Sequence, residues 1–123
     1  MSFAVKYRFN FISYSVQFNA LLHFIYSLFR HAIQCYVQCL FGIRHDDYNY
    51  ALVNELLPRR LKKYIKTVAC YPERCRIEEY NVIMPDFRRS EKIHVCLLVC
   101  EARLQSELLY ACRAISDYYS NSS

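Results

Sequence analysis

The chain has 123 residues, of which 54% are hydrophobic and 16% aromatic, and its formal net charge is +5. This length and composition fit a folded domain and exclude a disordered tail. The only glycine, Gly42, excludes phosphate-cradling loops, dinucleotide folds and nucleophile elbows, because each of these sites needs several glycines. We therefore expect a single domain over residues 1–123, without a cofactor and without catalytic residues.

The N-terminal segment suggests first a strand and then a long helix. Residues 3–11 alternate strictly between apolar and polar side chains, which predicts a half-buried strand. Residues 9–29 are uncharged, yet they contain enough asparagine, glutamine, histidine and serine to make spanning a bilayer costly. From about Tyr14 the apolar spacing is helical, and Gly42 is placed to end this helix.

The middle of the chain predicts two further helices. Asp46 or Asp47 is expected to cap a helix that runs from Tyr48 to Leu56. Pro58 then breaks that helix or opens a new one, since proline is tolerated in a first helical turn. Pro72 ends the second helix.

Residues 76–84 read as a strand, and residues 92–100 fit either a third strand or the start of the last helix. That helix is expected from about Glu101 to Tyr119. Its apolar series comprises Ile93, Leu97, Cys100, Leu104, Leu108, Ala111, Ile115 and Tyr118. The expected fold class is α+β, a helix-dominated single domain with two or three short strands.

The seven cysteines are an odd number, and most lie in apolar periodic segments. This distribution favours buried, reduced thiols and a cytoplasmic or nuclear location. Cys35 and Cys39 lie within a predicted apolar helix, one helical turn apart. Structural zinc usually takes closely spaced cysteine pairs that lie on turns, where the thiolates can converge, so no metal site is expected. The Cys-Tyr units at Cys35 and Cys70 leave open a secreted, disulfide-stapled effector as the alternative.

A basic stretch lies in the second of the central helices. It comprises Arg59, Arg60, Lys62, Lys63 and Lys66, with Tyr64 among them. These cations can contact phosphates, and the tyrosine can stack on a base. A nucleic-acid-binding accessory protein is therefore one alternative function, although the net charge is only moderate.

The most specific string in the sequence runs from Leu57 to Ile65 and reads Leu-Pro-Arg-Arg-Leu-Lys-Lys-Tyr-Ile. Residues 28–68 around it resemble the SOCS box, and the core of the string is similar to F-box-like motifs. This resemblance implies docking to an adaptor subunit of a cullin ubiquitin ligase. The implied partner-binding residues are Leu57, Pro58, Leu61, Tyr64 and Ile65.

The sequence therefore predicts a non-enzymatic accessory protein, viral or lineage-specific, that binds a protein partner. A small membrane-associated subunit using residues 9–29 is the remaining alternative. The oligomeric state is left open.

Overall fold

The computed structural model describes residues 16–83, 85 and 87–122, and every element in this part of the chain is helical. The elements are α2 (Val16–Leu40), α3 (Ala51–Leu56), α4 (Arg59–Cys70), the 3-10 turn η1 (Pro72–Arg74), α5 (Ile77–Ile83) and α6 (Arg89–Asn121). The predicted strand at 3–11 lies outside the described residues.

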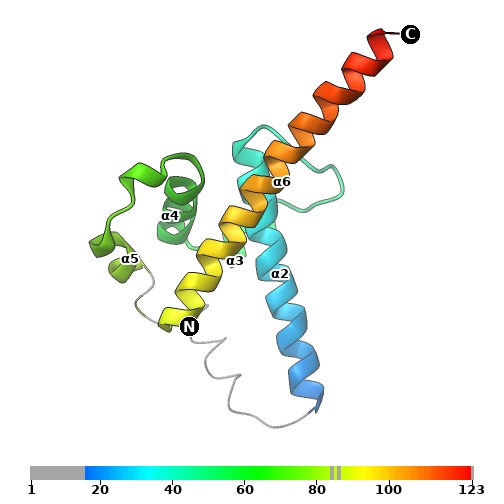
Figure 1. Ribbon diagram of the computed structural model, residues 1–123. Helices are drawn as coiled ribbons and strands as arrows, with labels where there is room; N and C mark the ends of the chain where they lie inside the picture. Colours follow the sequence, from blue (N-terminus) through cyan, green and yellow to red (C-terminus); the bar gives the residue numbers. More distant parts are fainter. Residues whose placement is uncertain (1–15, 84, 86, 123) are drawn as a thin grey trace.

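Two long helices, α2 and α6, cross and form the frame of the molecule (Figure 1). Helix α3 packs against α2, and α4 contacts both long helices as well as α5. Helices α4 and α5 lie together on one side of α6, and the C-terminal part of α6 extends beyond the other helices (Figure 1). The packed region therefore uses only the first half of α6.

The core lies where α2, α4 and α6 meet. Its side chains with no exposed surface include Ile33, Val37, Leu57, Ile65 and Val99. Each such side chain contributes about 1.5–3 kcal/mol through removal of apolar surface from water. The core thus joins segments that lie far apart in the sequence.

The α+β prediction is wrong for the described residues, which form no strand. The segment predicted as a strand at 76–84 contains helix α5, whose half-buried Tyr80 and Ile83 are three residues apart. This spacing puts both on one helical face towards the core cluster. Glu78 and Glu79 in its first turn also favour the helix, since they complement the helix dipole.

Residues 92–100 are helical and belong to α6, which begins at Arg89. Val95, Leu98, Val99 and Ala102 are buried, and their spacing of three, one and three residues places them on one side of a helix. A strand would have put Leu98 and Val99 on opposite faces. Packing against α2 and α4 therefore selects the helix.

Gly42 ends α2 in the way that the sequence predicts. Its φ angle is +81°, and the backbone N–H groups of Gly42 and Ile43 donate to the carbonyls of Cys39 and Gln38. These two hydrogen bonds form a Schellman motif, which favours glycine at this position. The Tyr110 hydroxyl of α6 donates to the Phe41 carbonyl beside this turn.

The next helix begins later than predicted. Helix α3 starts at Ala51, whose backbone N–H donates to the Asn49 side chain, so neither Asp46 nor Asp47 caps it. The Tyr50 hydroxyl accepts a hydrogen bond from the backbone N–H of His45 and so fixes the preceding loop. Pro58 stands at the N-cap of α4 and separates the two helices.

Candidate partner-binding surfaces

The residues that the sequence predicts for partner binding face the core. Leu57 and Ile65 are fully buried, Leu61 is 4% exposed and Tyr64 is 5% exposed. Pro58, at the start of α4, is exposed. The structure thus brings these residues together, but the four large side chains contact the protein interior. Their role in partner binding stays a prediction.

Tyr64 connects α4 to α6. Its hydroxyl lies 3.5 Å from the sulfur of Cys96, and its ring lies 6.2 Å from that of Tyr80 on α5. Burial raises the pKa of Tyr64 above its usual value, and the hydrogen bond with Cys96 adds to this effect. Tyr64 is therefore a neutral, packed residue at physiological pH.

The cationic residues occupy the outer face of α4. Arg59, Arg60, Lys63 and Lys66 are exposed, and Lys62 is half-buried. The ammonium group of Lys62 donates to the Asn54 side chain at 2.7 Å, which ties α4 to α3. This face is available for ligands, and nucleic-acid binding by it stays a prediction.

A groove of about 540 Å³ lies between α4, η1 and α5. Arg60 and Lys63 line its α4 side, and Glu78 and Glu79 line its α5 side. Between these charged residues lie the side chains of Tyr64, Tyr71, Val82 and Ile83, which make its floor largely apolar. The volume falls in the range of ligand-binding pockets.

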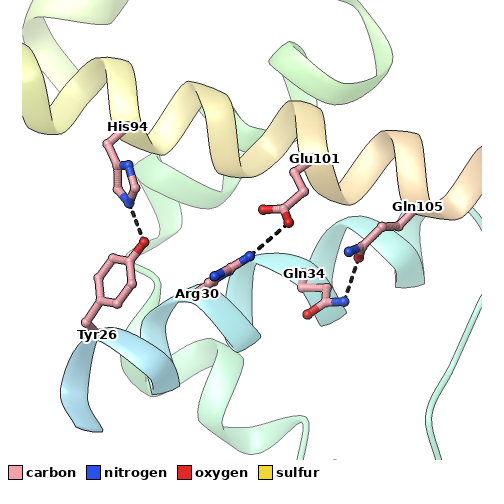
Figure 2. A network of polar contacts seen from close by, with 6 residues as sticks. All are labelled: Tyr26, Arg30, Gln34, His94, Glu101 and Gln105. Atoms are coloured by element: carbon pink, nitrogen blue, oxygen red, sulfur yellow. Dashed lines mark hydrogen bonds and ion pairs between the residues drawn. The ribbon is translucent and has the colours of Figure 1, made fainter. Parts of the chain in front are cut away.

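A row of polar pairs joins α2 to α6 (Figure 2). Arg30 donates to Glu101 at 2.8 Å, Gln34 donates to Gln105 at 2.6 Å, and Tyr26 hydrogen-bonds His94. The space beside Arg30 and Glu101 measures about 10 Å³, which is enough for one water molecule at most. The row therefore connects the two helices through three pairs of polar side chains.

Helix α6 carries a second apolar face, opposite to the one in the core. Its residues are Ile93, Leu97, Leu104, Leu108, Ile115 and Tyr118, which are 49–69% exposed. With 3.6 residues per turn, the intervals of three, four and seven residues align these side chains along one stripe. We call this set the α6 stripe. The sequence predicts this series, but its spacing alone does not tell whether the series is buried or exposed.

The free cysteines differ widely in exposure, which corrects the expectation of buried thiols. Cys35 is buried, whereas Cys39, Cys75, Cys100 and Cys112 are exposed. Burial raises the pKa of Cys35 to about 11, and Asp47 adds to this effect. In the part of the chain that the structure describes, no group of three or more His, Cys, Asp or Glu side chains is placed to hold a metal ion.

Comparison with known proteins identifies the family. The family model of the PA26 p53-induced protein (sestrin) matches residues 13–119. Human Sestrin-2 is 59% identical over 92 residues, which cover 75% of this chain and 19% of the relative. The Drosophila melanogaster Sestrin homolog is 53% identical over 92 residues (75% of this chain, 18% of the relative), and mouse Sestrin-3 is 59% identical over 87 residues (71% and 18%).

The chain belongs to the sestrin family, and it spans about a fifth of the length of the curated relatives that it matches. This finding overturns the resemblance to SOCS boxes and F-box-like motifs at residues 28–68. The string from Leu57 to Ile65 is a proline-started core helix, and its leucines serve packing. Relatives in human, mouse and fly also overturn the viral or lineage-specific origin. None of the described helices is long and apolar enough to cross a membrane.

Proposed function

We propose that this chain is part of a stress-response regulatory protein that acts by binding a protein partner and not by catalysis. The family description, p53-induced protein, supports the regulatory role. The observation that carries partner binding is the α6 stripe. The prediction of a cytoplasmic or nuclear location is retained as part of this proposal.

The stripe extends along α6 from Ile93 to Tyr118, a length of roughly 38 Å at 1.5 Å per residue. From Glu107 to Asn121 every residue of the helix is exposed, and the hydrogen bond from Tyr110 to the Phe41 carbonyl lies near the start of this part. A continuous apolar stripe of this kind marks an interaction surface. An isolated helical segment of this length is marginally stable in water, and contact with a second polypeptide would stabilise it.

The spacing of the stripe indicates the form of the partner surface. Leu97, Leu104, Leu108 and Ile115 recur at intervals of seven, four and seven residues, which suits packing against another helix. We therefore propose a protein helix as the occupant. We propose that this helix belongs to a separate protein partner.

The test is affinity purification from cells with mass spectrometry, using the complete protein that contains this chain. A double variant, Leu108→Glu with Ile115→Glu, introduces two negative charges on the stripe. Arg113→Glu is the matched control, because it changes the net charge equally at an exposed position away from the stripe.

We expect the double variant to lose partner proteins that the control retains, with circular dichroism of the two proteins unchanged. An identical set of partners in both variants would refute the proposed surface. Loss of thermal stability in the double variant alone would show that the stripe packs within the complete protein.

A further inference from the structure

The groove between α4, η1 and α5 has walls of opposite charge. Arg60 and Lys63 are three residues apart on α4 and so lie on the same edge of the helix. Glu78 and Glu79 stand in the first turn of α5 on the other wall. Among the described residues, no ion pair joins the two walls. All four side chains are therefore available to a ligand.

The floor of the groove offers apolar contact between these walls. Val82 is 61% exposed and Tyr71 is 42% exposed, although each lines a concave surface. The Arg74 guanidinium lies 4.7 Å from the centre of the Tyr71 ring, so η1 adds a third cation to the lining of the groove. A ligand that fits must bring an apolar surface between two edges of opposite charge.

We propose that this groove binds a short amphipathic helix of a protein partner, with acidic residues along one edge and basic residues along the other. Its acidic edge faces Arg60 and Lys63, its basic edge faces Glu78 and Glu79, and its apolar side chains cover Val82 and Tyr71. The α4 residues that line the groove run from Arg60 to Thr67, about 10 Å along the helix axis, so the groove accommodates about two turns of a bound helix.

The acidic wall distinguishes this ligand from a nucleic acid. Phosphates along Arg60 and Lys63 would lie opposite Glu78 and Glu79, and the like charges would repel each other. A polypeptide meets both walls with complementary charges. The groove shares no residue with the α6 stripe, so this proposal does not depend on the proposed function.

The experiment uses the 123-residue chain and a phage-displayed library of 16-residue peptides. Wild-type protein should enrich peptides with apolar residues at helical spacing and charges of both signs. The variant Arg60→Glu with Lys63→Glu should bind the best synthetic peptide about tenfold more weakly in fluorescence anisotropy. The variant Glu78→Lys with Glu79→Lys should show a similar loss.

A quadruple variant that combines the four substitutions restores opposite charges across the groove, so it should again enrich peptides of mixed charge. Lys66→Glu, an exposed substitution on α4 outside the groove lining, serves as the control and should change affinity less than twofold. Circular dichroism of every variant reports whether the fold is intact.

Two outcomes would overturn the proposal. The first is the absence of enriched peptides, or equal affinity of the best peptide for the wild-type protein and both double variants. The second is a particular pattern of binding to a 12-nucleotide single-stranded RNA probe. Binding that Arg60→Glu with Lys63→Glu abolishes and Glu78→Lys with Glu79→Lys strengthens would assign the groove to nucleic acid instead.

Discussion

Replacing Leu57 by alanine should strongly destabilise the protein, because the Leu57 side chain has no exposed surface. The substitution removes three carbon atoms, and at about 0.8 kcal/mol each the lost transfer free energy is about 2.4 kcal/mol. The cavity that remains adds to this loss, which brings the expected total to about 3–4 kcal/mol. For a chain of this size, 1 kcal/mol corresponds to roughly 4 °C in the melting temperature, so the expected decrease is about 12–16 °C.

Thermal unfolding followed by circular dichroism measures this effect. Glu55→Ala is the matched control, because Glu55 is exposed on α3 two residues earlier and its loss should change stability by less than about 0.5 kcal/mol. A decrease of less than 3 °C for Leu57→Ala would contradict the position of Leu57 in the core. It would also reopen a role for this residue in contacting a partner.

Three further predictions follow from the turn after α2, from a buried thiol and from the α2–α6 contact. Gly42→Ala should cost about 1–2 kcal/mol in urea unfolding, because the φ angle is +81° and the new methyl group would lie 3.3 Å from the Tyr110 hydroxyl; an unchanged midpoint would contradict this backbone conformation. The wild-type protein should lose stability between about pH 9 and 11 relative to Cys35→Ala, because the pKa of Cys35 is raised from 9.0 to about 11 and the unfolded chain loses its proton first; parallel curves for the two proteins in this range would refute the burial of this thiol. A double-mutant cycle with Arg30→Ala and Glu101→Ala should give a coupling energy of only about 0.2–1 kcal/mol, because the two side chains are 50% and 43% exposed; a coupling above about 2 kcal/mol would contradict the solvent exposure of this ion pair.

The sequence predicts both long helices and the end of α2, but it places the start of α6 about twelve residues too late. Gly42 ends α2 and Pro58 separates α3 from α4, as the sequence predicts from the backbone preferences of glycine and proline. The segment 76–84 was misassigned because short apolar runs fit a strand or a helix equally well. Contact with α4 decides in favour of α5, and this contact joins segments that local sequence cannot relate.

The candidate surfaces were harder to predict, because exposure depends on how the helices pack. The sequence predicts a helix for the part of the series after Glu101 and leaves residues 92–100 open, and its spacing does not indicate that the series forms the exposed stripe. The buried face of α6 consists of other residues, among them Val95, Val99 and Ala102. The basic wall of the groove was visible as a charged stretch on α4. Its opposition to Glu78 and Glu79 arises only from the turn at Pro72, which brings α5 back along α4.

The 33 residues of α6 form one uninterrupted helix, with neither proline nor glycine between Arg89 and Asn121. Its N-terminal half packs in the core, and the hydrogen bond from Tyr110 to Phe41 lies near the start of the exposed half. Since sharp kinks in helices arise mostly at proline or glycine, the exposed half is expected to keep the direction that the packed half sets.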